Sequence, residues 1–131
     1  MARLLVIEPN TILAQIYQTI LTKNKHKVWL ANNAQEAINL ADKTHPEVVI
    51  LELQLPLHNG LEFLYEFRSY SEWRDIPVII QSLVSPNEFK DSFILWHKLG
   101  IRAYLYKPKS TLLQLIDSVN SNLPQPVHNI L

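Results

Sequence analysis

The chain alternates five times between a short apolar run and a longer stretch with helical spacing. The apolar runs span residues 4–7, 28–31, 48–51, 78–80 and 103–106. Runs this short, and this rich in branched side chains, are typical of strands buried on both faces of a sheet. Strands that alternate with helices predict a parallel sheet covered by helices on both sides. We therefore expect an α/β fold of three layers, with a doubly wound five-stranded parallel sheet and five helices.

The stretches between the runs carry the start and stop signals of helices. Residues 12–21 place six large apolar side chains in one stripe, and the next helical stretch ends before Pro46. The sequence SPNE at residues 85–88 has the order of a capping box, with Pro at the first helical position. Gly100 is expected to close that helix in a left-handed conformation. Ser110 is expected to cap the last helix.

The length allows one domain with a proper core. The chain has 131 residues, which is too short for two domains of ordinary size. We expect one domain over residues 1–123 and a C-terminal tail over residues 124–131. The tail either lacks order or docks on a partner. We expect a stand-alone domain without an output domain, which would act through contact with another protein.

Charge and cysteine content exclude several classes of function. Twelve basic and twelve acidic residues give a formal charge of zero, so no electrostatic footprint for nucleic acid or an anionic membrane is expected. The five histidines lack ligand spacing and there is no cysteine, which argues against a zinc site or a disulfide framework. The chain shows no signal peptide and no membrane span, and we expect a cytoplasmic protein.

Polar residues follow four of the apolar runs. Glu8 follows the first run, Glu52 the third, Ser82 the fourth and Lys107 the fifth. Right-handed crossovers bring the carboxyl ends of parallel strands to one edge, where such folds bind their ligands. We therefore expect Lys107 to find a carboxylate partner there, in Glu52 or Glu8. The loop after Glu52 contains Pro56, Asn59 and Gly60, and we expect Asn59 and Gly60 to reverse the chain through positive φ.

Up to Leu123 the chain resembles the receiver domain of two-component response regulators. The resemblance implies a flavodoxin-like sheet with strand order 2-1-3-4-5. In that family an acidic pair follows the first strand, a phosphate-accepting Asp ends the third and a hydroxyl ends the fourth. An aromatic switch residue lies in the fifth strand, and a Lys followed by Pro ends it. The corresponding residues here are Glu8 and Pro9 for the acidic pair, Glu52 for the acceptor Asp, Ser82 for the hydroxyl, Tyr104 for the switch and Lys107 for the phosphate-contacting lysine.

Two of these substitutions oppose phosphoryl transfer. Glu carries its carboxylate about 1.5 Å further out than Asp, and a displacement of about 1 Å can cost roughly a hundredfold in rate. Mg²⁺ requires near-octahedral oxygen ligands at about 2.0 to 2.1 Å, and Pro9 offers no side-chain oxygen. We therefore expect a pseudo-receiver with no catalytic residue, no cofactor and no functional metal site. The alternative is a weak Mg²⁺ ion at Glu8 and Glu52.

Without a metal, Glu52 is free to bond directly to Lys107. In one hypothesis the Glu52 anion permanently mimics part of the phosphorylated state, with Ser82 and Tyr104 turned toward the site. In the competing hypothesis a single small anion leaves the domain in its unmodified arrangement.

The interpretation that best fits these residues is an atypical receiver, not an enzyme, that acts by protein–protein interaction without phosphorylation. Its expected partners are a histidine kinase, an output protein or a second copy through the face of the fourth helix, fifth strand and fifth helix. The run Phe93, Ile94, Leu95 and Trp96 fills a helical turn, so at least one side chain must point away from the core. We favour an interface at these residues over the alternative of scattered surface hydrophobicity, which is common in monomers.

Two other functions share the fold. The first alternative is a working phosphoacceptor that takes phosphate from a histidine kinase with Mg²⁺. The second is a nucleotide- or flavin-binding protein, which needs glycines whose amides approach the phosphates. The chain has only Gly60 and Gly100, and turns explain both.

Overall fold

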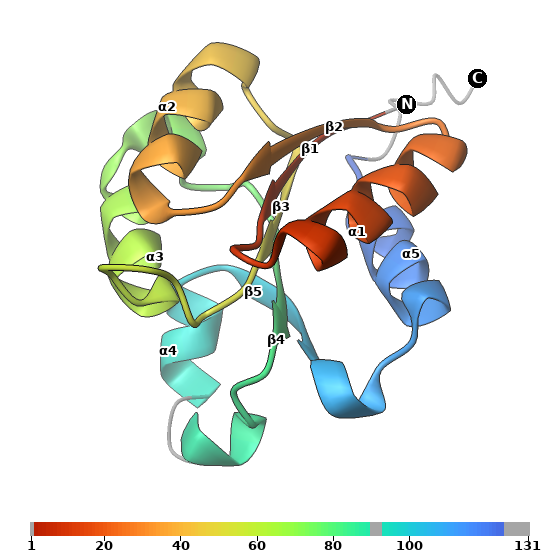
Figure 1. Ribbon diagram of the computed structural model, residues 1–131. Helices are drawn as coiled ribbons and strands as arrows, with labels where there is room; N and C mark the ends of the chain where they lie inside the picture. The colour runs from red at the N-terminus through yellow and green to blue at the C-terminus, as the bar shows by residue number, and fades with distance from the viewer. Residues whose placement is uncertain (1, 90–92, 125–131) are drawn as a thin grey trace, which may run out of the picture.

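The computed structural model describes residues 2–89 and 93–124, and for Phe89 and Phe93 it describes the backbone. Strands and helices alternate along the described chain (Figure 1). The strands are β1 (Arg3–Ile7), β2 (Lys27–Ala31), β3 (Val48–Leu51), β4 (Val78–Ser82) and β5 (Ile101–Tyr106). The α-helices are α1 (Thr11–Lys23), α2 (Ala34–Thr44), α3 (Gly60–Ser69), α4 (Phe93–Lys98) and α5 (Leu112–Ser121). Three 3-10 helices are η1 (Ser71–Trp73), η2 (Pro86–Phe89) and η3 (Lys107–Lys109).

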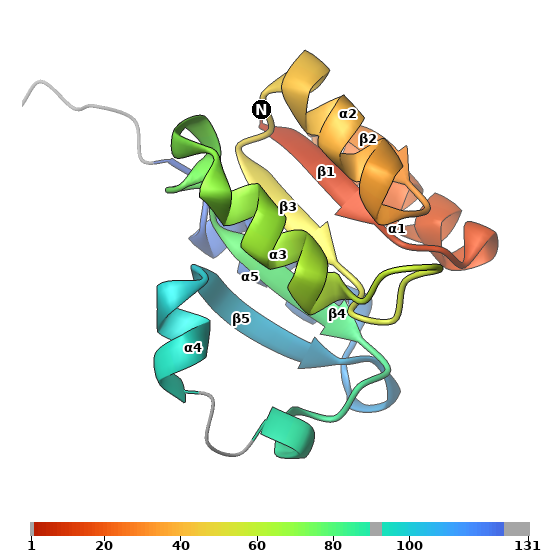
Figure 2. The ribbon, with the colours of Figure 1, turned by 90° about the vertical axis from the view of Figure 1, so that its left-hand side faces the viewer.

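The five strands form one parallel sheet in the order β2-β1-β3-β4-β5. Helices α1 and α5 cover one face, and α2, α3 and α4 cover the other (Figures 1 and 2). All strands point the same way, so their carboxyl ends meet at one edge (Figure 2). The predicted α/β fold and strand order are confirmed.

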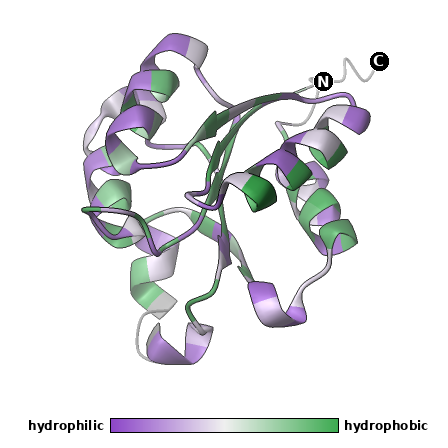
Figure 3. Ribbon diagram, in the orientation of Figure 1, coloured by the Kyte–Doolittle hydropathy of each residue, from purple (hydrophilic) through white to green (hydrophobic). Residues whose placement is uncertain are grey.

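The apolar residues gather in the central strands (Figure 3). Every residue of β3 and β4 is buried, as is all of β1 except Arg3. The outer strands differ, because most residues of β2 and β5 are only half-buried. Burial on both faces was therefore a correct prediction for the three inner strands and wrong for the two outer ones. Each outer strand has a neighbouring strand on one side only.

Helix α1 buries a narrower face than its apolar stripe predicts. Ala14, Tyr17 and Leu21 are buried against the sheet, whereas Ile12 is 70% exposed and Ile16 is 40% exposed. The apolar stripe of α1 is wider than the face that contacts the sheet. Side chains at the margin of the stripe therefore do not reach the core. The helix therefore presents two large aliphatic side chains to the outside.

Two predicted helix starts are wrong. The Ser85 hydroxyl accepts a bond from the Asn87 amide at 3.2 Å, and the Ser85 carbonyl accepts one from the Glu88 amide at 3.1 Å. This i to i+3 bonding starts the 3-10 helix η2, and the described part of α4 begins only at Phe93. Ser110 does not cap α5, because it is the C-terminal capping residue of η3. Thr111 caps α5 in a capping box with Gln114.

The predicted end of the fourth helix is confirmed. Gly100 follows α4 with a φ of 71°, the left-handed conformation expected of it.

Residues 125–131 of the predicted tail lie outside the described residues. In the described part of the chain, no helix is both long enough and apolar enough to cross a membrane.

The loop between β3 and α3 reverses at an unexpected residue. Positive φ occurs at Leu57, with a φ of 71°, and Leu57 is 96% exposed. Asn59 has a φ of −79° and caps α3 by accepting a bond from the Glu62 amide at 2.9 Å. The prediction that Asn59 and Gly60 supply positive φ is therefore wrong. The turn needs one left-handed residue, and it falls where the side chain meets only solvent.

Gly60 is required by close packing. A Cβ atom at Gly60 would lie 2.7 Å from Leu53 Cα and 3.1 Å from the Glu52 carbonyl oxygen. The Gly60 amide also donates to the Leu53 carbonyl at 2.7 Å. The glycine thus holds the backbone that carries Glu52 against the start of α3.

We expect Gly60→Ala to lower the free energy of unfolding by about 1–3 kcal/mol, because the new methyl group forces the backbone apart. Urea denaturation measures the change, with Glu66→Ala on the exposed face of the same helix as the control. Alanine favours a helix over glycine by about 1 kcal/mol when nothing else changes. A stabilised Gly60→Ala variant would therefore contradict the close approach.

Arg68, on α3, ties together three chain segments. Its guanidinium donates to the carbonyls of Leu99 at 2.8 Å, Trp73 at 2.5 Å, Arg74 at 3.2 Å and Ile76 at 2.5 Å. These are four of the five N–H groups that arginine offers. One side chain thus satisfies carbonyls after α4, at the end of η1 and before β4.

Candidate functional site

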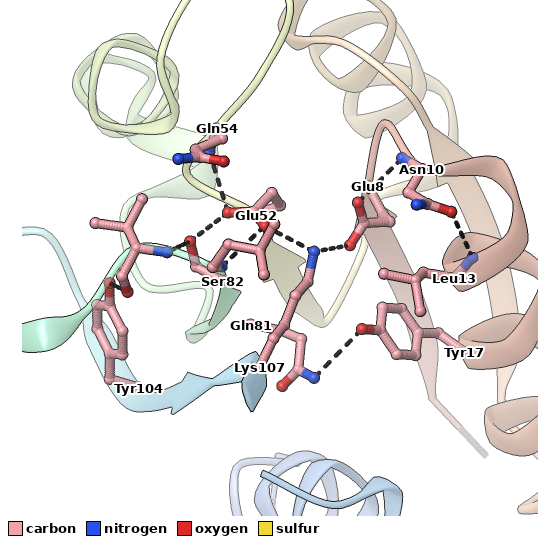
Figure 4. A network of polar contacts seen from close by, with 12 residues as sticks. Glu8, Asn10, Leu13, Tyr17, Glu52, Gln54, Gln81, Ser82, Tyr104 and Lys107 are labelled. Carbon is pink, nitrogen blue, oxygen red and sulfur yellow. Dashed lines mark hydrogen bonds and ion pairs between the residues drawn. The ribbon is translucent and has the colours of Figure 1, made fainter. Parts of the chain in front are cut away.

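Four side chains meet at the carboxyl edge of the sheet, each placed by the end of a strand (Figure 4). Glu8 directly follows β1, Glu52 directly follows β3, Ser82 ends β4 and Lys107 directly follows β5. Glu8 is 3% exposed, Glu52 is 2% exposed and Ser82 is fully buried. The structure therefore brings together the polar residues that the sequence places after four strands.

Lys107 lies between the two carboxylates. Its Nζ is 2.6 Å from Glu8 Oε1 and 2.7 Å from Glu52 Oε1. The contact with Glu52 has the geometry of a hydrogen bond, and the contact with Glu8 is an ion pair without that alignment. Only 9% of the Lys107 side chain is exposed. The expected pairing of Lys107 with a carboxylate is present, and both candidate carboxylates take part.

Each oxygen of Glu52 accepts hydrogen bonds from more than one group. Besides Lys107, Oε1 accepts from the Leu83 amide at 3.1 Å. Oε2 accepts from the Ser82 hydroxyl and from the Gln54 amide at 3.1 Å. The ammonium, the hydroxyl and the two amides come from three different loops and strand ends. A buried carboxylate with this many donors is held firmly in its ionised form.

The pKa values of the pair follow from these contacts. Burial alone raises the pKa of Glu52, but the bonds from Lys107, Ser82 and the two amides outweigh it and leave the pKa below its usual value. Burial alone lowers the pKa of Lys107, but its hydrogen bond to Glu52 and its close ion pair with Glu8 outweigh burial and leave the pKa above its usual value. Both groups are therefore charged at neutral pH.

Tyr104 turns toward this network. Its hydroxyl donates to the Val84 carbonyl at 2.5 Å, and the Val84 amide donates to the Ser82 hydroxyl oxygen at 3.0 Å. Burial, and next the negative charge of Glu52, raises the pKa of Tyr104 to about 12. The Tyr104 ring stacks on Trp96, with centroids 5.0 Å apart. A continuous chain of contacts thus runs from Glu52 through Ser82 and Val84 to Tyr104 and α4.

The residues at this edge do not suit Mg²⁺. An ion bound by Glu8 and Glu52 would compete with the Lys107 ammonium for the same oxygens, and Pro9 adds no ligand. The second oxygen of Glu8 accepts a bond from the Asn10 amide at 3.1 Å, and Asn10 caps α1. Within residues 2–89 and 93–124, no three His, Asp or Glu side chains are placed to hold a metal ion.

The apolar run in α4 is only partly exposed. Ile94 is 81% exposed, whereas Leu95 packs against the core and Trp96 stacks on Tyr104. The side chain of Phe93 lies outside the described residues. The expectation that at least one residue of this run points away from the core is confirmed by Ile94.

A second polar pair, not predicted from the sequence, lies beside the network. Gln81, in β4, donates to the Tyr17 hydroxyl of α1 at 3.3 Å (Figure 4). The signal was present, because Gln81 is a polar residue that directly follows the apolar run at residues 78–80. Backbone amide donors such as that of Leu83 leave no signal in the sequence, because every residue except proline carries one.

Comparison with known proteins identifies related sequences. Residues 4–119 match the family model described as the response regulator receiver domain. PilH of Pseudomonas aeruginosa is 30% identical over 121 residues, which cover 91% of this chain and 98% of PilH. The probable transcriptional regulator ycf29 of Pyropia yezoensis is 31% identical over 119 residues, which cover 89% of this chain. The chain spans about half of that relative, since the match covers 52% of it.

Solved structures confirm the likeness of fold. The chemotaxis response regulator CheY4 of Vibrio cholerae aligns with 94% of this chain and 99% of its own, with a TM-score of 0.82 at 22% identity. The receiver domain of the Francisella response regulator 1452 aligns with 92% of this chain and 95% of its own. Its TM-score is 0.79 at 27% identity.

Proposed function

This chain belongs to the response regulator receiver domain family of two-component signalling, and we propose that it works there as a pseudo-receiver that is not phosphorylated. One observation carries the proposal. Both oxygens of Glu52, at the position of the acceptor Asp, are engaged by Lys107, Ser82 and two backbone amides. A nucleophile must present a free lone pair in line with the phosphorus atom. Here attack requires those bonds to be broken first.

The metal requirement supports the same proposal. Phosphoryl transfer needs Mg²⁺ to neutralise the charge that develops on the phosphoryl oxygens. At this edge the cation is the Lys107 ammonium, which already lies between Glu8 and Glu52. Pro9 removes the second acid of the pair. Glu52 and Pro9 thus act against transfer by two independent routes.

The contacts also favour one of the two states considered for Glu52. We propose that its carboxylate stands in for a phosphoryl group and keeps the edge in a phosphorylated-like arrangement. The Ser82 hydroxyl and the Lys107 ammonium, which the family resemblance assigns to phosphate contacts, both bond to Glu52. Tyr104 bonds to Val84 on the same side. A permanent anion at residue 52 supplies permanently the charge that phosphorylation supplies for a time.

Such a domain acts through a binding surface. Receiver domains interact with histidine kinases and other signalling proteins, and the proposed surface here is that of α4, β5 and α5. Trp96 and Tyr104 stack there, and Ile94 is exposed. We propose a cytoplasmic signalling protein, an output protein or a second copy of the chain, as the partner.

Incubation with acetyl phosphate and Mg²⁺, followed by intact-mass measurement, tests the proposal. We expect no mass gain for the natural chain. We expect one phosphoryl group to be gained by a variant that carries Glu52→Asp and Pro9→Asp together, because it restores a shorter nucleophile and a second acid. Glu52→Asp alone, without the second acid, serves as the matched control. A phosphoryl group on the natural chain that disappears in Glu52→Gln would overturn the proposal.

A further inference from the structure

A polar pocket of about 390 Å³ lies at the amino edge of the sheet, the edge opposite the Lys107 network. The ends of α3 and α4 and the starts of β4 and β5 come together there (Figure 2). Pockets of about 300–1,000 Å³ are typical in size of small-molecule sites. The charged residues of the lining are Arg68, Arg74, Asp75, Lys98 and Arg102. Four cations and one acid thus gather in one pocket, although the whole chain has twelve residues of each sign.

The cations of this pocket lack a counter-charge within the described chain. Among residues 2–89 and 93–124, no ion pair includes Arg74, Lys98 or Arg102. Asp75, the acid of the lining, forms no ion pair there either. Arg68 donates to backbone carbonyls, which carry no net charge. Four cations against one carboxylate therefore leave three positive charges uncompensated, with the histidine of the lining counted as neutral.

These cations also act on one another. Burial, and next the charge of Arg102, lowers the pKa of Arg68, while the carboxylate of Asp75 opposes this change. The two guanidinium groups are thus close enough to repel each other. A hollow lined by one sign of charge concentrates the field and attracts ions of the opposite sign. A bound anion relieves the repulsion, which no group of the described lining does completely.

The backbone of β5 places Arg102 at this pocket through an irregularity in the sheet. Val78 pairs with Ile101 and Ile79 pairs with Ala103, so Arg102 has no partner on β4. Such bulges are frequent at sheet edges and beside functional sites, where they redirect a side chain. Strand β5 is an edge strand, and both Ile101 and Arg102 line the pocket. The bulge is evidence, independent of the charge count, that the position of Arg102 is specified.

The types of cation favour phosphoryl oxygens as the ligand atoms. Arg74 and Arg102 are exposed, and their planar guanidinium groups match the oxygens of a phosphoryl group in pairs. Lys98, also exposed, adds a point charge from the end of α4. A phosphoryl group carries about 1.5 to 2 negative charges near neutral pH. Two linked phosphoryl groups therefore supply about the charge that the lining leaves uncompensated, and they span more than one cation.

We propose that this pocket binds a small anion with two linked phosphoryl groups, either free pyrophosphate or the diphosphate end of a nucleotide, through Arg74, Lys98 and Arg102. The proposal goes beyond the pseudo-receiver function and does not depend on it, because the pocket lies at the opposite edge of the sheet from Glu52. The bound anion links the loop before β4, the end of α4 and the start of β5. Its binding thus stabilises the position of α4, which belongs to the proposed partner surface.

Titration of the natural chain with pyrophosphate, followed by amide NMR without Mg²⁺, tests the proposal. We expect shifts at Ile76, Gly100 and Arg102, and none at Ser82 or Leu83 beside the Lys107 network. Pyrophosphate should bind about tenfold more tightly than orthophosphate at the same ionic strength, because it alone reaches both exposed arginines at once. Adenosine diphosphate identifies the source of the group: tighter binding than that of pyrophosphate indicates a nucleotide, and equal or weaker binding indicates the free anion.

Variants separate a site from general attraction to positive charge. Arg102→Gln should weaken the binding of pyrophosphate about fivefold, the upper range for one exposed ion pair. Adding Arg74→Gln should weaken it about twenty-fivefold in total when the two effects add. Lys23→Gln, on α1 across the sheet, removes the same charge and should keep the natural affinity. An equal loss in Lys23→Gln, equal binding of pyrophosphate and orthophosphate, shifts centred on Ser82 and Leu83, or no shift at millimolar pyrophosphate would each overturn the proposal.

Discussion

Lys107→Met should lower the free energy of unfolding at neutral pH by about 3–5 kcal/mol, the cost of breaking a buried ion pair from one side. The variant keeps the length and apolar stem of the side chain but leaves Glu8 and Glu52 facing one another without a cation. Both carboxylates are at least 97% buried, so solvent cannot take over the role of the ammonium. Urea denaturation measures the loss.

The dependence on pH identifies the cause of this loss. In the natural protein the pKa of Glu52 is lowered from about 4.5, so its contribution is present above that value and is lost as pH falls through the folded pKa. The pKa of Lys107 is raised from 10.5, so its contribution is present below that value and is lost at more alkaline pH. Natural stability should therefore fall on acidification. Lys107→Met should instead gain stability as pH falls from 7 toward 5, because protonation removes an unpaired buried charge.

A second-site change provides the control. Adding Glu8→Gln and Glu52→Gln to Lys107→Met removes all three charges together, and replacement of a whole buried ionic group is often near neutral. We expect the triple variant to recover most of the lost stability. A Lys107→Met variant that loses less than about 1 kcal/mol, the range of an exposed pair, would contradict the buried ion-pair arrangement.

Arg68→Met should lower the free energy of unfolding by about 3 kcal/mol, because it removes charge-assisted bonds to four backbone carbonyls. Methionine preserves the apolar stem but also removes the guanidinium that lies over the Phe67 ring, 5.5 Å from its centroid. Arg68→Lys should recover only part of the loss, since one ammonium cannot reach three chain segments as the planar guanidinium does. Urea denaturation of both variants measures the difference.

Arg74→Met is the matched control for Arg68. Arg74 is exposed, and its replacement should change stability by no more than about 0.5 kcal/mol. Equal effects at residues 68 and 74 would show that the bonds to the carbonyls contribute little. A larger effect at Arg68 alone would locate the stabilisation in the junction between η1, β4 and the end of α4.

The sequence predicted the edge of the sheet better than it predicted the turns. Apolar runs locate strands because burial requires them, and the position after each run located Glu8, Glu52, Ser82 and Lys107 correctly. The N-terminal cap of α5 was harder to predict, because Ser110 and Thr111 are both residue types that cap helices. In the folded chain Ser110 ends η3, and Thr111 caps α5. The left-handed residue was assigned to Asn59 or Gly60 by preference, yet Leu57 adopts it in the folded chain.

Contacts made by the backbone could not be predicted in the same way. The amides of Gln54 and Leu83 bind Glu52, but any residue other than proline would offer the same donor. The role of Arg68 was also hidden, because a lone arginine in a helix is usually exposed. Both required the loops to be placed in space. Gln81 was visible as a polar residue directly after an apolar run, although its partner Tyr17 could not be predicted.

The burial of the Lys107 network makes its ion pairs much less sensitive to salt than ion pairs at the surface. Dissolved ions weaken attraction between charges at the surface, such as Arg3 with Glu47, whose side chains are 46% and 25% exposed. They have no access to a lysine that is 9% exposed between two carboxylates that are almost fully enclosed. We therefore expect the shape of this edge to change little between dilute and concentrated electrolyte.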